Sequence, residues 1–202
     1  MTKQPENKAP VKHSRDAAET RARILKAAKI QFSKYNYESI GVRDIAAEAD
    51  VDAALINRYF GSKERLFVEA ITGAFRSIDL LHDDLSGLRE SLTRHLISKQ
   101  KEFMLTEGFN PLHLLLRSAM SHTVSPIVAE VFNKEFITPL AELLGGEDAV
   151  LRARLISSYI IGFVTVWVAF TPQDILLNDV DKMIAFLGTA IQSCVESDGT
   201  SE

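Results

Sequence analysis

The chain has 202 residues, of which 46% are hydrophobic and 25% charged, so its composition is that of an ordinary globular protein and excludes a disordered or fibrous one. A single cysteine, Cys194, excludes an intramolecular disulfide framework and favours a reducing, cytoplasmic location. The net charge of −4 conceals an asymmetry, since residues 1–63 sum to +4 and residues 64–202 to −8. Such segregation is typical of a polyanion-binding unit joined to an acidic body.

No membrane segment is expected. The first twenty residues are polar and lack the apolar core of a secretory signal. The most apolar run, residues 155–170, is sixteen residues long and contains two serines and a threonine, whereas a membrane span needs about twenty apolar residues. This run therefore predicts a helix that is buried on all sides.

The N-terminal region predicts a basic arm followed by a helix. Residues 1–15 carry lysines and two prolines but few apolar side chains, and we expect them to be disordered. A helix is predicted to begin at Asp16, because Asp16 and Glu19 have the spacing of a capping box. Asn36 is expected to end it, since asparagine tolerates the left-handed conformation of a helix C-cap. The apolar stripe of this helix comprises Ile24, Leu25, Ala28, Phe32 and Tyr35.

Two short helices joined by a tight corner follow. They are predicted over residues 42–49 and 53–60. Asp50 suits the corner because aspartate tolerates positive φ, and Asp52 suits the N-cap of the second helix. This pattern indicates a helix-turn-helix, whose second helix fits the major groove of DNA, about 12 Å wide.

The second helix of this motif has distinct faces at 100° per residue. Ile56 and Phe60 lie on the inner face, whereas Ala54 and Arg58 lie on the outer one. The flanks carry Asn57 and Tyr59. The inner pair is expected to anchor the helix while the polar neighbours are displayed.

The rest of the chain predicts helices only. Ser62 is the N-cap of a helix expected to reach about Ile78, and another helix carries Leu88, Leu92, Leu96 and Phe103 on one face. The remaining signals are helix starts at Asn110-Pro111 and Ser125-Pro126, an interruption at Pro139, a stop at Gly145-Gly146, and helices over residues 148–170 and 179–195. The predicted fold is all-α, with about nine helices: a three-helix head over residues 16–62 and a larger helical bundle over residues 63–202.

The segment from Thr20 to Ile71, "TRARILKAAKIQFSKYNYESIGVRDIAAEADVDAALINRYFGSKERLFVEAI", resembles the TetR family of bacterial transcriptional regulators. The resemblance implies a homodimer with a DNA-binding head and a ligand-sensing, dimerising helical body. The chain departs from the family at four positions. Asn36 and Asp50 replace glycines, Asp52 replaces a serine, and Asn57 replaces a tyrosine that grips phosphate.

Carried over onto this chain, the resemblance implies DNA contacts from Arg43, Ala53, Ala54, Leu55, Asn57, Arg58, Tyr59 and Lys63. Arg43 would contact a base, with the O6 and N7 atoms of guanine as a plausible target. Asn57 could read adenine instead of holding phosphate. Lys63 would hold phosphate at the positive end of its helix. Tyr59 has the alternative of packing inside the head.

The last two helices are expected to form a dimer interface. Residues 155–170, together with Ile184, Leu187 and Ile191, would bury their surplus apolar faces against a second copy as a four-helix interface. An intrachain core helix is the alternative. Two heads would then bind half-sites about 34–36 Å apart on double-stranded DNA.

A small apolar or aromatic ligand is expected in the body, with His113 or Arg117 orienting its polar end. The candidate lining residues are Phe75, Phe103, Phe109, His113, Arg117, Met120, Phe132, Phe136 and Trp167. Aromatic and methionine side chains of this kind also form ordinary helical cores, so a plain core is the alternative. No cofactor or metal is expected.

The sequence thus predicts a DNA-binding transcriptional regulator, with a repressor favoured because a dimer on a palindrome near a promoter blocks polymerase. A regulator without a small-molecule inducer is the alternative. A metal-dependent enzyme is more remote: residues 82–84 read His-Asp-Asp, but adjacent helical side chains diverge and no catalytic motif accompanies them. A non-specific nucleoid protein would need far more positive charge.

Overall fold

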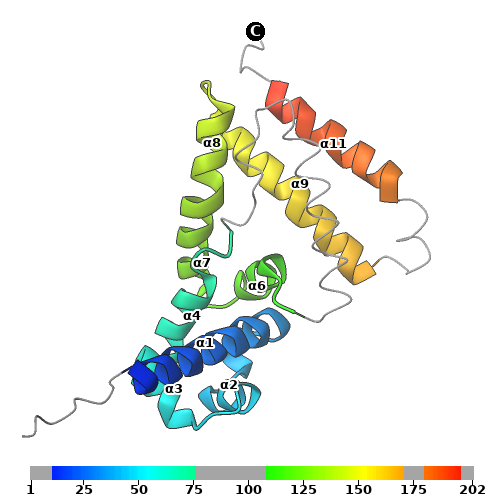
Figure 1. Cartoon of the computed structure of the whole chain (residues 1–202). Helices are drawn as coiled ribbons and strands as arrows, with labels where there is room; N and C mark the ends of the chain where they lie inside the picture. Colours follow the sequence, from blue (N-terminus) through cyan, green and yellow to red (C-terminus); the bar gives the residue numbers. More distant parts are fainter. Residues whose placement is uncertain (1–10, 76–107, 171–179, 197–202) are drawn as a thin grey trace, which may run out of the picture.

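The computed structural model describes residues 11–75, 108–170 and 180–196, and every regular element in these ranges is helical (Figure 1). The predicted all-α fold, with an N-terminal helix-turn-helix and a larger helical body, is therefore confirmed. The N-terminal elements are α1 (Val11–Lys34), the 3₁₀ turn η1 (Tyr37–Ser39), α2 (Val42–Glu48), α3 (Ala53–Phe60) and α4 (Lys63–Ile71). The later elements are α6 (Pro111–Ser118), α7 (Ser125–Phe132), the π-helical turn η3 (Asn133–Ile137), α8 (Thr138–Leu144), α9 (Ala149–Phe170) and α11 (Val180–Glu196).

The core of the head lies where α1 crosses α4. Phe32 and Phe67 are fully buried there and meet edge to face, with their ring centres 5.0 Å apart. The ring of Tyr37 from η1 completes the cluster, 5.2 Å from Phe67 and 5.9 Å from Phe32. Such aromatic pairs add to the free energy gained from apolar burial. Ile45 of α2 and Ile56 of α3 are also fully buried, so one core holds all four helices together.

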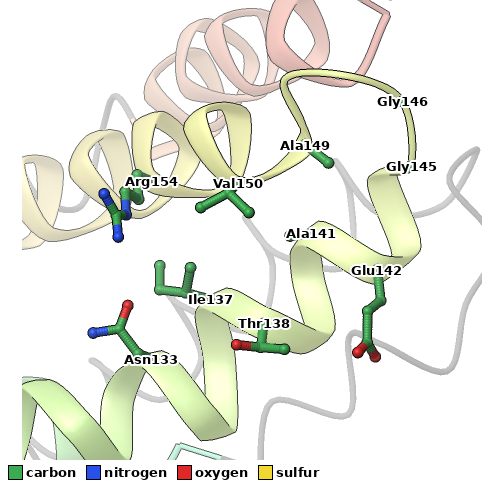
Figure 2. A pocket seen from close by; sticks show the side chains of 10 residues that line it. All are labelled: Asn133, Ile137, Thr138, Ala141, Glu142, Gly145, Gly146, Ala149, Val150 and Arg154. Carbon is green, nitrogen blue, oxygen red and sulfur yellow. The ribbon is translucent and has the colours of Figure 1, made fainter.

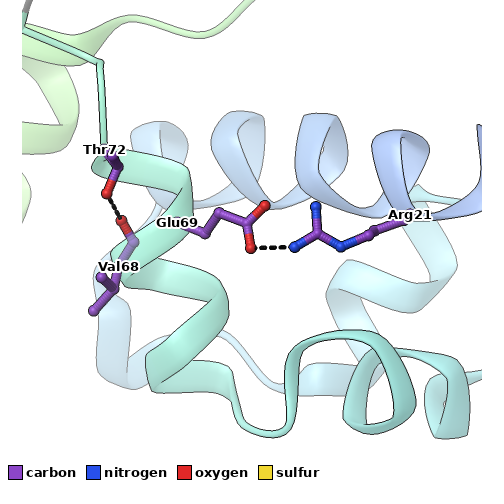
Figure 3. Close-up of polar contacts among 4 residues, drawn as sticks. All are labelled: Arg21, Val68, Glu69 and Thr72. Atoms are coloured by element: carbon purple, nitrogen blue, oxygen red, sulfur yellow. Dashed lines mark hydrogen bonds and ion pairs between the residues drawn. The ribbon is translucent and has the colours of Figure 1, made fainter. Parts of the chain in front are cut away.

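A polar contact also joins α1 to α4. The guanidinium of Arg21 lies 2.5 Å from the carboxylate of Glu69 (Figure 3), and it also lies 4.6 Å from the ring centre of Phe60. Both charged side chains remain partly exposed, so solvent screens the pair and its contribution to stability is small. The aromatic core, and not this pair, is therefore the main contact between α1 and α4.

Three sequence predictions about the head are corrected. α1 begins at Val11, five residues before Asp16, whose backbone carbonyl accepts a 2.8 Å hydrogen bond from Thr20 inside the helix. Asn36 is extended, with φ −67° and ψ 145°, and it leads into η1 without adopting a left-handed cap. Tyr35 is more than half exposed because α1 ends at Lys34; Tyr37 is the tyrosine that joins Phe32 in the core.

The helix after Ser62 is shorter than predicted. α4 ends at Ile71, where the Thr72 hydroxyl donates 2.7 Å to the carbonyl of Val68 (Figure 3). Gly73 then adopts φ 77°, a left-handed conformation that stops a helix and that glycine takes at little cost. The predicted continuation to Ile78 is therefore wrong. The predicted helix over residues 88–103 lies outside the described residues.

The described part of the body comprises α6, an arm formed by α7, η3 and α8, and the long helices α9 and α11 (Figure 1). Pro139 lies in the first turn of α8, directly after η3, so the predicted interruption near this proline is confirmed. The start at Asn110-Pro111 is confirmed as well, since the Asn110 side chain accepts hydrogen bonds from two backbone amides of α6. Gly145, with φ 60°, ends α8 as predicted.

Arg152, in the first turns of α9, is buried and is held by backbone carbonyls. Its guanidinium donates to the carbonyls of Cys194 and Val195 near the end of α11, at 3.4 and 3.3 Å, and to that of Gly145 after α8. A helix C-terminus carries partial negative charge, so two such ends compensate this buried cation. Within the described residues, no helix combines the length and apolar character required to cross a membrane.

Candidate DNA-binding surface

The corner between α2 and α3 is held by several hydrogen bonds. Asp50 adopts φ 51°, as predicted for this position, and the amide of Val51 donates 3.0 Å to the carbonyl of Ala46. Arg23 reaches from α1 to the carbonyl of Asp50, at 3.3 Å. The Asp52 carboxylate accepts a 2.7 Å hydrogen bond from the amide of Ala54, which confirms the predicted N-cap. These contacts fix the angle at which α3 leaves the corner.

The faces of α3 are those predicted. Ile56 and Phe60 are buried in the head core, whereas Ala54, Asn57 and Arg58 are exposed. The remaining predicted contacts, Ala53, Leu55 and Tyr59, are half-buried and pack partly against the core. The exposed strip of α3 therefore offers one small residue, one amide and one guanidinium, which suits close approach to base edges together with hydrogen bonding.

Arg43 lies in the first turn of α2 and is exposed. The neighbouring Asp44 carboxylate accepts a 2.7 Å hydrogen bond from the amide of Gly41, which holds the start of the helix. The helix start is thereby ordered while the guanidinium of Arg43 remains accessible. The predicted role of Arg43 in contacting a base stays a prediction.

We expect Arg43→Ala to cost about 1–3 kcal/mol of DNA-binding free energy and to relax the preference at one base pair. Arg43→Lys is the matched variant: it keeps the charge but loses the bidentate geometry that reads guanine, so it should also lose the base preference. Competition binding with every single-base variant of the site measures both effects. An equal loss on all sequences would assign Arg43 to phosphate instead.

Lys63 begins α4, but its ammonium group is engaged inside the head. It donates to the carbonyl of Tyr37 and lies 3.9 Å from the centre of the Tyr37 ring. Burial lowers the pKa of Lys63, and the nearby carboxylates of Glu38 and Asp44 oppose this shift. Lys63 therefore has a structural role in holding Tyr37, in addition to the predicted phosphate contact. The spacing of the sequence did not predict this structural role.

Lys63→Ala is expected to weaken binding to every DNA sequence alike and to reduce the slope of log affinity against log salt by about 1. Lys63→Met keeps the aliphatic stem but removes the charge, so comparison of the two variants separates packing on Tyr37 from phosphate binding. Binding isotherms at a series of salt concentrations supply the slopes. A loss that depends on DNA sequence would contradict a backbone role.

The predicted ligand-binding residues do not form one group. Phe75, Phe132 and Phe136 come together as an aromatic cluster, with successive ring centres 5.3 Å apart. Met120 is 86% exposed, and the exposed Arg117 donates 3.0 Å to the carbonyl of Ser33 at the end of α1. These two positions near the end of α6 are therefore on the surface of the single chain.

The other candidate lining residues are separate from this cluster. The ring of Phe109 lies 5.5 Å from the ammonium of Lys29. His113 is half-buried, and burial lowers the pKa of its imidazole, with a smaller contribution from Arg117. Phe103 and the side chain of Trp167 lie outside the described residues.

An open groove of about 410 Å³ lies between α8 and α9 (Figure 2). Ile137 and Val150 face each other across it, with Asn133 and Arg154 at one end. None of the predicted ligand-binding residues lines this groove, whose full lining is Asn133, Ile137, Thr138, Ala141, Glu142, Gly145, Gly146, Ala149, Val150 and Arg154. Sequence reasoning missed it because a groove between consecutive helices depends on their crossing geometry, which no local pattern specifies.

No group of histidine, cysteine or acidic residues suited to a metal ion is found in the described part of the chain. The His-Asp-Asp run at residues 82–84 lies outside that part. The candidate functional site is therefore the surface formed by α2 and α3.

Comparison with known proteins agrees with this geometry. Residues 24–70 match the family model described as bacterial regulatory proteins, tetR family, and residues 87–195 match the model of the tetracyclin repressor-like C-terminal domain. The chain belongs to the TetR family. TetR-family proteins are transcriptional regulators and not enzymes, and this chain is accordingly a DNA-binding regulator.

Individual TetR-family relatives span most of the chain. The HTH-type transcriptional repressor KstR of Rhodococcus jostii is 27% identical over 155 residues, which cover 74% of this chain and 73% of the relative. KstR of Mycobacterium tuberculosis is 28% identical over 160 residues, covering 74% and 71%. A TetR-family regulator of Streptomyces coelicolor, SCO0857, has the same fold, with a TM-score of 0.58 at 23% identity, over 95% of this chain and 99% of that one.

Proposed function

We propose that the protein is a homodimeric transcriptional repressor that binds a palindromic operator and is released by a small apolar or aromatic ligand. The observation that carries the DNA-binding part is the exposed strip of α3, held at a fixed angle by the Asp50 corner and the Asp52 cap. A helix presented in this way fits the major groove, and a pair of heads reads two half-sites.

The exposed apolar side chains of α9 and α11 support the homodimer. Leu151, Leu155 and Val166 lie along one side of α9 and are 41–57% exposed in the single chain. Phe186 projects from α11 with 77% of its surface exposed. Large apolar side chains exposed in this way are typical of a protein interface. A second copy is the proposed partner, because the same two-helix face can pair with itself around a twofold axis.

The proposed interface differs in detail from the sequence prediction. Leu187 and Ile191, which were expected to face the partner, are buried within the subunit, because this side of α11 packs against α9. Phe186 takes their place on the exposed side. The alternative of an intrachain core helix is corrected, since Leu155 and Val166 are exposed in the single chain. Burial of these faces of α9 against a second copy stays a prediction.

Repression is proposed from two considerations. The curated relatives that match the chain are named as transcriptional repressors. A dimer on a palindrome near a promoter blocks polymerase without any further interaction surface. The proposed ligand would act by shifting the population between conformations with different head positions, to the extent of its differential affinity for them.

A regulator without a small-molecule inducer is the second candidate. The packing of Phe75, Phe132 and Phe136 against one another favours it, since these rings fill space that a ligand would otherwise occupy. A panel of apolar and aromatic compounds, tested for release of the protein from its operator, distinguishes the two. Release by at least one compound supports the inducer, whereas undiminished operator binding throughout the panel favours the second candidate.

Selection of bound sequences from random double-stranded DNA tests the main proposal. We expect a palindrome with two half-sites, together with a salt dependence that reflects several phosphate contacts. The double variant Asn57→Ala with Arg58→Ala should lose the selected sequence, while Lys134→Ala, an exposed change on the body, should retain it. Enrichment of no sequence, or of a single unrepeated half-site, would contradict the proposal.

A further inference from the structure

Glu135 is a buried carboxylate that connects two parts of the body. It lies in the middle of η3, and only 6% of its surface is exposed. One carboxylate oxygen accepts a 2.8 Å hydrogen bond from the amide of Gly73, and the other accepts a 3.3 Å hydrogen bond from the amide of Phe75. Both amides belong to the turn that follows α4, so the carboxylate fixes the end of that helix to the α7–η3–α8 arm.

Aromatic packing reinforces this connection. The ring of Phe75 meets that of Phe132 edge to face, and Phe132 in turn stacks on Phe136, the residue after Glu135. The turn after α4 is therefore held by its backbone amides and by the side chain of Phe75 at once. Motion of η3 would carry the end of α4 with it.

The other end of α4 belongs to the DNA-binding head. α4 begins at Lys63, three residues after α3 ends at Phe60, and Ser62 between them accepts a 3.1 Å hydrogen bond from the amide of Arg65. Phe67 of α4 packs in the aromatic core against α1, and Glu69 pairs with Arg21. These contacts join α4 to the head, so a shift of the far end of α4 would be transmitted toward α3.

The arm that carries Glu135 contains a π-helical turn, η3. A π turn contains one residue more than the corresponding α turn, and such turns occur frequently at functional sites. In η3, three consecutive residues, Glu135, Phe136 and Ile137, are buried. Conversion of the turn to regular α-helix would rotate the side chains on one side of it, which would withdraw the Glu135 carboxylate from the turn after α4.

We propose that Glu135 is a positioning residue for operator recognition: by holding the end of α4, it sets the separation of the two heads and hence the half-site spacing that the dimer accepts. This inference rests on the proposed homodimer with a palindromic operator. It makes spacing selectivity depend on a residue remote from the DNA surface, in a helical arm separate from the head.

Glu135→Gln is the principal test. The amide side chain keeps the size of glutamate but has one oxygen acceptor, so its NH₂ group faces one of the two backbone amides and that hydrogen bond is lost. Glu130→Gln, an exposed substitution on α7, is the matched control. Binding is measured on the selected operator and on operators in which the half-sites are one or two base pairs closer or farther apart. Amide hydrogen exchange of the peptide containing residues 72–75 is followed in parallel.

We expect Glu135→Gln to accelerate exchange in the 72–75 peptide and to reduce the preference for the native spacing by about fivefold or more, the scale of a typical coupling between sites. Glu130→Gln should match the wild type in both measurements. By linkage, operator DNA should slow exchange of the same peptide in the wild-type protein, a measurement that requires no variant.

Two outcomes would overturn the inference. One is unchanged spacing preference in a folded Glu135→Gln protein whose 72–75 peptide exchanges faster. The other is wild-type exchange in this peptide that is insensitive to operator DNA, which decides the matter even if the variant does not fold. Failure of the wild-type protein to select a palindrome is a different result, since it contradicts the proposed function itself.

Discussion

Alanine at position 67 is expected to lower the free energy of unfolding by about 3–5 kcal/mol, the range for removing a large aromatic side chain from a core. Phe67 is fully buried, and its ring lies 5.0 Å from that of Phe32 and 5.2 Å from that of Tyr37. The cavity would lie between α1, η1 and α4, so operator affinity should fall together with stability. Chemical denaturation followed by circular dichroism measures the first effect, and a binding isotherm measures the second.

Phe67→Leu is the control for this prediction, because it keeps most of the apolar volume and should cost about 1 kcal/mol. An alanine variant no less stable than the leucine variant would mean that the aromatic cluster does not hold α4 against α1. The proposed connection from η3 to the head would then be weakened, because α4 would not be held firmly in the head.

Glutamate at position 155 is expected to abolish the proposed homodimer. Leu155 is partly exposed in the single chain, so the carboxylate is tolerated by the monomer, but a twofold interface would bury two such charges without partners. The dimer dissociation constant should rise by about 100-fold or more, which corresponds to about 2.7 kcal/mol. Analytical ultracentrifugation measures this change, and operator binding should fall to that of a single head on a half-site.

Met120→Glu is the matched change outside the proposed interface, since Met120 is a large apolar residue that is even more exposed than Leu155. It should leave the dimer intact. Dissociation by Met120→Glu and not by Leu155→Glu would place the interface on the α6 side of the molecule. A Leu155→Glu protein that remains dimeric would contradict an interface formed by α9.

The helix-turn-helix could be predicted from the sequence because its determinants are local. Asp50 takes positive φ and Asp52 caps α3, and each acts on backbone groups within a few residues of itself. The spacing of Ile56 and Phe60 likewise specifies the inner face of α3 without reference to the rest of the chain. Propensity and capping rules suffice for such features.

The sequence predictions were wrong or incomplete where the structure depends on packing between elements that are distant in sequence. Tyr35 continues the helical periodicity of α1, yet the helix ends one residue before it and Tyr37 enters the core from η1. Pro139 marked an interruption but not its π-helical form. No sequence pattern pointed to Glu135, because its hydrogen-bond partners Gly73 and Phe75 are 62 and 60 residues away in sequence.

The apolar pattern of α11 was insufficient for a related reason. Leu187 and Ile191 have the spacing of an interface, but the sequence does not say whether that interface lies within the subunit or between subunits. The structure assigns them to the interior and leaves Phe186 outside. Which face of α11 is buried within the subunit depends on the neighbouring helices, and the sequence pattern of one helix carries no information about them.

Arg152 has a consequence for how such a protein can diversify. Its guanidinium donates hydrogen bonds to main-chain carbonyl oxygens of α11, and every amino acid has such an oxygen. Exposed side chains of α11 can therefore be substituted without loss of the hydrogen bonds that hold the helix to its own subunit. In the proposed homodimer, substitution of Phe186 and its exposed neighbours would therefore change which copies pair without disturbing the packing of α11 on α9.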